Sequence, residues 1–500
     1  MARTILFIMV DQLAAKWLEE ADTGVVDLPN LRELRRRGVT FTRAFTNNPV
    51  CSPSRASIAT GVMPAVHGLT ECGYSLDPDV PTFMDALQEA GWGTAAFGKL
   101  HFQPQIAGVN PDYREYGFDE TAITEDARAG EWLDWVREEH PEHFEAAAAT
   151  VWMTMIPELD AYGEHSEDLR SVILRARERY PEVTRNAYTL PFPAEVSQTE
   201  WITGRAVDYL RRSGTSDVFA QVSYVQPHNP FTPPAEYLDR VNTNALPEPT
   251  PAAWQDEPIA YYSQERYDQL STETADWRLE RHYYFADLAH LDDQLGVLMN
   301  TLSELGRREE SLILFTSDHG EMLHDQGLLG KWERHYDACI RIPLILAGEG
   351  VEPGSREELV DHLDIAPTIL GWAQVPEPAL PVRSADGLTF TRALKGRDLR
   401  EEASHERAGV LIQSNGSHHD PGLVSWARTV RTASHRYTRH FAGGGEQLFD
   451  LEADPDEQHN LAEAPHAKGL RTELSSLLLE LEVADASPQA ATGLYQLGSW

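Results

Sequence analysis

The feature that most constrains the fold is a series of short, almost wholly apolar runs separated by helical segments. The strongest runs cover residues 5–10, 218–224, 312–316 and 343–347. Strands that are apolar on both faces need helices on both faces of their sheet, and their alternation with helices is typical of parallel pairing. The sequence therefore predicts an α/β fold with a large, mostly parallel sheet sandwiched by helices.

The chain divides into two predicted domains. Residues 1–375 carry the strand and helix alternation and form the larger domain. It is interrupted at about 119–196 by acidic, tryptophan-bearing helices that we interpret as an insertion over the sheet's edge. A Pro-rich stretch at 375–382 marks the boundary. Residues 376–500 predict a smaller C-terminal α+β domain built on short antiparallel strands, with a helix and a tail.

Composition and charge exclude several classes of protein. With 42 Lys and Arg against 79 Asp and Glu, the net charge of −37 opposes binding to nucleic acid or to sulfated polysaccharide. No apolar run approaches the roughly 20 residues of a membrane span, and the first run ends at Asp11 without a secretory cleavage pattern. The three cysteines suggest no disulfide framework. We therefore expect a cytoplasmic protein that acts on a small molecule.

Cys51 lies in the motif Cys-Ser-Pro-Ser-Arg, at a turn that opens a predicted helix. A helix amino terminus presents backbone N–H groups to an anion, and Arg55 can hold an anionic oxygen with its planar guanidinium. The stretch through Gly61 resembles the signature of the type I sulfatases, formylglycine-dependent enzymes of the alkaline phosphatase superfamily. The resemblance extends over nearly the whole chain. It implies that a separate maturation enzyme oxidises Cys51 to formylglycine.

The implied modification has a chemical purpose. A hydrated aldehyde carries two hydroxyls on one carbon, so one can attack sulfur and expel the alcohol while the other loses its proton to eject sulfate. An unmodified Ser or Cys would be left as a stable ester. The alternative interpretation of Cys51 is a buried thiol beside an ordinary helix N-cap.

Two strand ends carry candidate metal ligands. Asp11 and Gln12 follow the first apolar run, and Asp318 and His319 follow the run at 312–316. Carboxylates that converge at one edge of a sheet need a cation between them, although a strand-end Asp is also often a helix cap. The resemblance places one divalent metal on these four residues and on the modified Cys51. The resemblance implies calcium as the first candidate for this metal. The nitrogen donor of His319, and an amide in place of a second carboxylate at Gln12, leave manganese and magnesium as alternatives.

Lysine is rare in this chain, with five lysines among the 42 basic residues. Two of them, Lys99 in Gly-Lys-Leu-His and Lys331 after Gly330, lie in glycine-containing loops. The resemblance implies that Lys99 and His101 flank the formylglycine, with His101 as the base. It also implies that His228 and Lys331 contact the sulfate and the bridging oxygen. Without the other motifs, His228 would be an ordinary loop residue.

We therefore predict a metal-dependent sulfatase that cleaves a sulfate monoester of a small alcohol or phenol. The Asp-Gln and Asp-His pairs resemble choline-sulfatase-like and phosphonate-monoester-hydrolase-like branches. Hydrolysis of a phosphonate monoester or phosphodiester at the same site is therefore one alternative. A second is a non-catalytic anion-binding protein in which Cys51 stays a thiol. The tail 486–500 is either a docking segment for a homo-oligomer or a frayed terminus.

Overall fold

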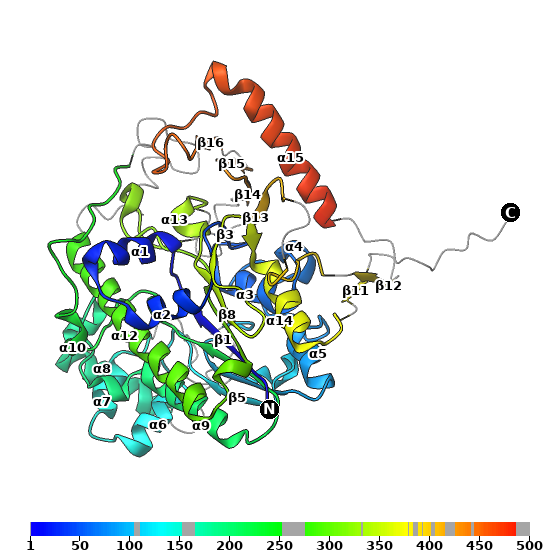
Figure 1. The fold of residues 1–500 in the computed structure, drawn as a ribbon. Coiled ribbons are helices and arrows are strands. Elements are labelled where there is room, and N and C mark those ends of the chain that lie inside the picture. Colours follow the sequence, from blue (N-terminus) through cyan, green and yellow to red (C-terminus); the bar gives the residue numbers. More distant parts are fainter. Residues whose placement is uncertain are drawn as a thin grey trace.

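An eight-stranded sheet forms the centre of the larger part of the molecule (Figure 1). The computed structural model describes residues 2–104, 111–152, 166–252, 276–331, 334–378, 380–383, 389–392, 394–401, 406–415, 426–441 and 445–486. The strand order is β5-β4-β6-β1-β7-β8-β2-β9, and all neighbours pair in parallel except β8, which is antiparallel to β7 and β2. The strands are β1 Thr4–Val10, β2 Gly38–Phe41, β4 Gly93–Gly98, β5 Glu120–Ile123, β6 Val218–Ser223, β7 Ser311–Ser317, β8 Leu344–Gly348 and β9 Gly354–Arg356. The predicted, mostly parallel α/β sheet is confirmed.

Helices cover both faces of this sheet, as the apolar strands require. Leu6 and Ile8 of β1 belong to a core on one face, whereas Ile5 and Phe7 belong to a core on the other. The first core includes side chains of α1 Ala15–Glu20, α2 Pro29–Arg37, α9 Gln198–Arg212 and α12 Trp277–Glu304. The second includes side chains of α3 Cys51–Thr60, α5 Phe83–Glu89 and α14 Ile365–Ala373. Short helices are α4 Pro64–His67, α10 Ala235–Leu238 and α13 Asp337–Ile340.

The segment that we interpreted as an insertion begins with a strand of the main sheet. Residues 120–123 form β5, which pairs in parallel with β4 at the sheet's edge. Its first two residues, Glu120 and Thr121, are only half-buried, so the run lacks the apolar character by which the other strands were recognised. Helices follow it at α6 Glu131–Glu139, α7 Phe144–Ala149 and α8 Ser166–Arg179.

A separate four-stranded antiparallel sheet forms the smaller C-terminal part, as predicted. Its strands are β13 Val410–Asn415, β14 Trp426–Arg431, β15 His435–His440 and β16 Glu446–Asp450, in that order. The helix α15 Lys468–Ala486 packs against this sheet through a shared core (Figure 1). Two-stranded pairings join β3 Ala44–Phe45 to β10 Val360–Asp361, and β11 Leu380–Arg383 to β12 Thr389–Arg392. The predicted tail beyond residue 486 lies outside the described residues.

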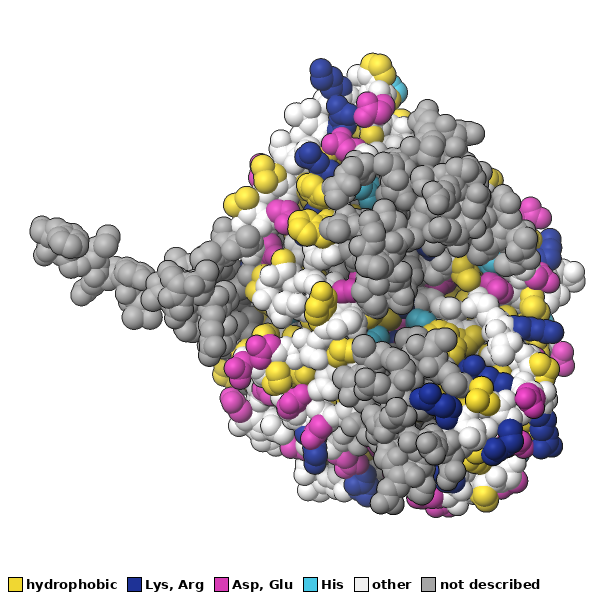
Figure 2. Space-filling view, turned by 180° about the vertical axis from the view of Figure 1, so that it is seen from behind, with side chains coloured by type: hydrophobic (Ala, Val, Ile, Leu, Met, Phe, Trp, Pro, Cys, Tyr) yellow, Lys and Arg dark blue, Asp and Glu magenta, His cyan; other side chains and the backbone are white. Residues whose placement is uncertain are grey.

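Acidic and basic side chains are interspersed over the face seen in Figure 2. Among the described residues, every helix is too short or too polar to cross a lipid bilayer.

Five adjacent parallel strands, β5, β4, β6, β1 and β7, end at the same edge of the main sheet. Parallel strands deliver the residues that follow them to one crevice at their carboxyl ends. Gly98 closes β4 there with a φ of +96°, and a Cβ at this position would lie 2.0 Å from the backbone oxygen of Ser223. Only glycine fits this turn, and Lys99 follows it directly.

Candidate active site

Cys51 is the first residue of α3, a helix that is buried along its whole length. Pro53 lies in the first turn, where its missing N–H costs no helical hydrogen bond. The hydroxyl of Ser54 donates to the backbone oxygen of Asp318 at 2.6 Å and so fastens the start of α3 to the end of β7. The helix therefore presents Cys51 at the carboxyl edge of the sheet.

The two predicted strand-end pairs meet at Cys51. Its Sγ lies 3.8 Å from Oδ1 of Asp11 and 3.3 Å from Nε2 of His319. One donor atom each of Asp11, Cys51, Asp318 and His319 lies within 4.8 Å of the others, and all four residues are buried. The convergence expected from the ends of β1 and β7 is therefore present in the fold.

Gln12 joins this group through both its backbone and its side chain. Its backbone N–H donates to Oδ1 of Asp318 at 3.1 Å, and its φ is +67°, which a non-glycine residue rarely adopts. Its Nε2 donates to Oδ1 of Asn229 at 3.2 Å and to the carboxylate of Glu321. Among the described residues, its Oε1 has no hydrogen-bond partner although it is buried. An orphaned carbonyl oxygen of this kind fits a metal ligand.

The imidazole of His319 is oriented for the same role. Its Nδ1 lies 2.9 Å from the backbone oxygen of Gly320, which only accepts, so Nδ1 carries the proton. The lone pair of Nε2 then faces Cys51 and the two carboxylates, at 3.6 Å from Asp11 and 3.7 Å from Asp318. Metal-binding histidines commonly donate their other ring N–H to a backbone oxygen in this way, which fixes the orientation of the ring.

Three buried cations surround the two carboxylates. Arg55 donates from Nε to Asp318 at 2.7 Å and from Nη2 to Asp11 at 3.3 Å. Lys99 Nζ lies 2.5 Å from Asp11, and Lys331 Nζ lies 2.7 Å from the sulfur of Cys51. A group of anions and cations this closely packed can hold a further anion at Cys51 without leaving it uncompensated.

The charges shift the titration of the site. Burial alone would raise the pKa of the Cys51 thiol, but a hydrogen bond with Cys72 and the charges of Lys331 and Lys99 hold that pKa well below its usual value. Burial also opposes ionisation of Asp318, yet His319 and Arg55 lower its pKa to about 2. The site therefore stabilises a negative charge at Cys51.

The two predicted histidines, His101 and His228, lie near this group of residues. A ring nitrogen of His101 lies within 4.8 Å of the sulfur atoms of Cys51 and Cys72. Its Nδ1 is buried and has no hydrogen-bond partner among the described residues. His228 Nδ1 lies 2.5 Å from the backbone oxygen of Asn229, and the His228 ring makes an edge contact with Trp152 at 6.2 Å. His228 lies close enough to Asp126 for its charge to lower the pKa of that carboxyl.

Three residues of the site were not predicted. Glu125 and Asp126 follow β5, and both oxygens of Asp126 lie 2.6 Å from Lys99 Nζ. Burial raises the pKa of Asp126, but Lys99 and His228 lower it below its usual range. Glu125 accepts from the backbone N–H of His101 at 3.0 Å. The rule for strand ends would have placed Glu125 and Asp126 in the site only if β5 had been recognised as a strand, and its half-buried start prevented that. Nothing in the sequence connects Cys72 with Cys51.

The chain is similar in sequence to known sulfatases. The family model described as Sulfatase matches residues 3–375, and the model described as N-sulphoglucosamine sulphohydrolase, C-terminal, matches residues 327–484. A choline-sulfatase of Rhizobium meliloti is 28% identical over 478 residues, which cover 92% of this chain and 82% of that protein. An arylsulfatase of Clostridium perfringens is 27% identical over 506 residues, 96% of this chain and 95% of that protein.

The fold also resembles solved structures. A phosphonate monoester hydrolase from Silicibacter pomeroyi superimposes with a TM-score of 0.76 at 24% identity, covering 97% of this chain and 96% of the other. At this identity the likeness extends to the fold alone.

Proposed function

We propose that this chain, which belongs to the sulfatase family, hydrolyses a sulfate monoester of a small alcohol or phenol with formylglycine derived from Cys51 as the nucleophile. The observation that carries the proposal is the position of Cys51, at the first turn of α3 and in contact with Asp11, His319 and Lys331. In this structure, the sulfur atom of Cys51 stands in for a hydroxyl that the hydrated aldehyde would carry in the mature protein. That hydrate supplies one hydroxyl to attack sulfur and a second to release sulfate.

The basic residues of the site orient the nucleophile and move its protons. Lys331 reaches the position of the nucleophile, and the guanidinium of Arg55 bonds Asp11 and Asp318 beside it, so both charges favour the anionic form of the nucleophile. Lys99 is held between Asp11 and Asp126, so its ammonium stays charged beside the same atom. His101, whose Nδ1 is buried without a partner among the described residues, is the base that takes the second hydroxyl's proton when sulfate leaves.

Asp11, Gln12, Asp318 and His319, together with the modified Cys51, are the proposed ligands of one divalent metal. The unpartnered Oε1 of Gln12 and the imidazole orientation of His319 fit such a group. When bound, the ion would neutralise the carboxylates and polarise the oxygens of the sulfate. Calcium is the first candidate on family grounds, while the imidazole nitrogen also suits manganese, and magnesium stays open.

His228 and Lys331 are the proposed leaving-group residues. An alcohol leaves poorly as an alkoxide, so a proton or a cation at the bridging oxygen accelerates its departure by roughly 10² to 10⁴. The hydrogen bond from Nδ1 of His228 to the backbone oxygen of Asn229 fixes the ring, so Nε2 is the nitrogen proposed to serve the bridging oxygen. Lys331 supplies a fixed positive charge beside the nucleophile.

The proposed substrate is small, because the net charge of −37 opposes polysulfated glycans. Relatives at 27–28% identity are named as a choline-sulfatase and an arylsulfatase, which fits an ester of a small alcohol or phenol. A maturation enzyme that converts Cys51 is the proposed macromolecular partner. The cytoplasmic location, the division at residue 375 and a homo-oligomer formed through the tail stay predictions.

A phosphonate monoesterase or phosphodiesterase is the second candidate. Gln12 and His319 carry less negative charge than a carboxylate pair at the same positions, and a phosphonate monoester matches a sulfate monoester in both charge and shape. Lys99 with His101 and the His228 loop favour sulfate.

A comparison of substrates tests the proposal. Turnover of 4-nitrophenyl sulfate is measured beside phenyl phosphonate esters and bis-4-nitrophenyl phosphate, on protein produced with a maturation enzyme. The proposal expects the highest kcat/KM for the sulfate, and a higher value for either phosphorus ester would favour the second candidate. Choline, alkyl, aryl and sugar sulfates then identify the alcohol.

The mass of the peptide that contains Cys51 separates both enzymatic proposals from the non-catalytic alternative. Conversion to the aldehyde lowers that mass by about 18 Da relative to cysteine. A chain that keeps the unmodified mass after co-expression with the maturation enzyme, and that hydrolyses none of these esters, would instead be an anion-binding protein.

A further inference from the structure

Glu321 is a fully buried carboxylate that follows His319 closely in the chain. Its Oε1 accepts hydrogen bonds from the backbone N–H groups of Leu323, at 2.8 Å, and of Gly330. Its Oε2 accepts from the side-chain amide of Gln12. Both oxygens are thus occupied, and the carboxylate joins the residue after Asp11 to the loop that carries Lys331.

This contact decides which end of the Gln12 amide faces the proposed metal. A carboxylate only accepts hydrogen bonds, so the amide must turn Nε2 toward Glu321. The second proton of Nε2 goes to Oδ1 of Asn229 at 3.2 Å. With both protons used, Oε1 is the remaining end, and it is buried without a hydrogen-bond partner among the described residues. Of the two ends of an amide, the carbonyl oxygen is the one that binds a cation.

We propose that Glu321 is a positioning residue that selects the amide orientation in which Gln12 presents its oxygen to the divalent cation. This inference rests on the metal site of the proposed function, and it assigns Glu321 no contact with substrate. Two further features make the selection firm. The left-handed backbone of Gln12 is held by the bond from its N–H to Asp318, and Asn229 is held by Asn186 at 3.2 Å.

The variant Glu321→Gln reverses the selection while keeping the size of the side chain. The side chain at position 321 then has one oxygen, which accepts the hydrogen bonds from the backbone N–H groups of Leu323 and Gly330. The new amide NH₂ therefore faces Gln12. The Gln12 amide then turns its oxygen toward position 321 and its NH₂ toward the metal. We expect the affinity of the metal-free protein for Mn²⁺ to fall about 10- to 100-fold.

A double variant reverses the polarity of the hydrogen bond and should restore binding. In Gln12→Glu with Glu321→Gln, one carboxylate oxygen at position 12 accepts from the amide at 321, and the other faces the cation. We expect the Mn²⁺ affinity of the double variant to return to within about threefold of the wild-type value, because the substitutions at positions 12 and 321 are in contact and offset each other. A residue that only maintained the fold would show no such rescue.

Glu280→Gln is the matched control. Glu280 is also a buried carboxylate, and it lies 2.7 Å from Nε2 of His324, but it is not bonded to Gln12. The same change of carboxylate to amide should leave the Mn²⁺ affinity unchanged. Melting temperatures of all variants check that each is folded.

Binding is measured by the electron paramagnetic resonance signal of free Mn²⁺ during titration of the metal-free protein, with Ca²⁺ as competitor. This readout needs neither turnover nor conversion of Cys51. Wild-type affinity in Glu321→Gln, or failure of the double variant to recover, would overturn the inference. If the wild-type protein binds neither Mn²⁺ nor Ca²⁺, the proposed metal site is overturned as well. If the expected binding pattern appears in a protein without sulfatase activity, the inference stands and the proposed function fails.

Discussion

Two charge clusters in the interior of this molecule differ in whether the acceptor oxygens in and around them meet donors. The catalytic cluster surrounds Cys51 and consists of Asp11, Arg55, Lys99, Asp318 and Lys331. The interface cluster joins α13 to strands β14 and β15 and consists of Asp337, Arg431, Arg436 and Glu457. Both bring carboxylates and cations together away from water.

In the interface cluster, each carboxylate oxygen meets a donor. The two oxygens of Asp337 accept from Nε and Nη2 of Arg431, both at 3.0 Å. Glu457 accepts from Arg436 through one oxygen and from the backbone N–H of Asp337, at 2.8 Å, through the other. A cluster satisfied in this way connects parts of the fold and leaves its anions no capacity for a ligand.

The catalytic cluster is bordered by buried atoms that have no hydrogen-bond partner among the described residues. They are Oε1 of Gln12, Nδ1 of His101 and Oε2 of Glu125. Leaving such atoms unsatisfied is costly unless a ligand completes them. The interface cluster also contains one donor atom that is unpartnered among the described residues, Nη2 of Arg436. The comparison therefore teaches that neither buried charge nor an unpartnered donor distinguishes a site from a structural contact, whereas unpartnered acceptor oxygens beside the charge, those of Gln12 and Glu125, do.

The largest expected effect follows from removing the nucleophile. Cys51→Ala should lower kcat/KM for 4-nitrophenyl sulfate by about 10⁴-fold or more, as loss of a nucleophile does in other hydrolases. The fold should persist, because alanine is apolar and small. Cys339→Ala is the control, since Cys339 is also a buried thiol but lies in a separate apolar core. Comparable activity in the two variants would show that Cys51 is not the nucleophile and that the cluster around it is not the active site.

Lys331→Ala should have the next largest effect, a fall in kcat of roughly 10² to 10⁴. The loss should be greater for an alkyl sulfate than for 4-nitrophenyl sulfate, because nitrophenolate leaves with little assistance. Rates for both esters are compared with those of Lys395→Ala, a lysine of the partly exposed pair with Asp485. Equal losses for the two esters would show that Lys331 does not serve the leaving group.

In the interface cluster, the same kind of change should affect stability instead of rate. Glu457→Gln removes the carboxylate that pairs directly with the buried Arg436 and leaves only Asp337 of this cluster to offset its charge. Breaking a buried pair costs up to about 3 to 5 kcal/mol of unfolding free energy. Urea unfolding measures this loss, and kcat/KM of the folded fraction should stay unchanged. Glu463→Gln, at a carboxylate that is 90% exposed, is the control. A loss of activity without a loss of stability would contradict the distinction between the clusters.

Asp287 tests whether a buried carboxyl outside both clusters, with no ion pair among the described residues, behaves as burial predicts. Burial raises its pKa to about 8, although the backbone N–H of Thr232 and the charge of Arg128 lower it. The folded state therefore keeps a proton that the unfolded state releases above about pH 4. The contribution of Asp287 to the free energy of unfolding is therefore fully present below about pH 4. It decreases as the pH rises toward 8, by up to about 1.4 kcal/mol per pH unit.

The variant Asp287→Asn mimics the protonated form and should lose this dependence. This variant should be more stable than the wild-type protein at pH 8 and similar to it at pH 4. Its amide oxygen can still accept the hydrogen bond from the backbone N–H of Thr232, which is 2.9 Å long in the wild-type protein. Thermal unfolding across this pH range measures the difference. Parallel stability curves for the two proteins would mean that Asp287 is ionised in the fold.

The sequence was sufficient for most strands and for the convergence of Asp11 with Asp318. Strands that are apolar on both faces are recognisable without tertiary context, and parallel strands deliver their carboxyl ends to one edge. The edge strand β5 was missed because Glu120 and Thr121 face partly toward solvent, and Asp126 was missed with it. The orientation of the Gln12 amide depends on Glu321, a contact that becomes visible only when the chain is folded.

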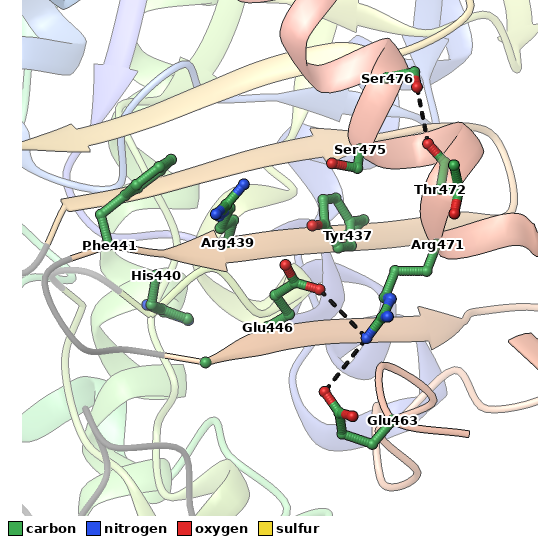
Figure 3. A pocket seen from close by; sticks show the side chains of 11 residues that line it. Tyr437, Arg439, His440, Phe441, Glu446, Glu463, Arg471, Thr472, Ser475 and Ser476 are labelled. Carbon is green, nitrogen blue, oxygen red and sulfur yellow. Dashed lines mark hydrogen bonds and ion pairs between the residues drawn. The ribbon is translucent and has the colours of Figure 1, made fainter. Parts of the chain in front are cut away.

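The smallest expected effect concerns a polar pocket of about 680 Å³ between α15 and strands β15 and β16 (Figure 3). Arg471 reaches from α15 to Glu446 at 3.7 Å and to Glu463 at 3.3 Å, as Figure 3 shows. These partners are partly or fully exposed, so water screens the pairs and each is worth at most about 1 kcal/mol. Arg471→Ala should therefore change stability little. It should also leave kcat/KM unaltered, because the charges of Glu446 and Glu463 offset that of Arg471 and the pocket does not attract an anionic substrate. A tenfold fall in activity would mean that a site far from the acceptor oxygens of Gln12 and Glu125 serves catalysis, and the criterion drawn from the two clusters would fail.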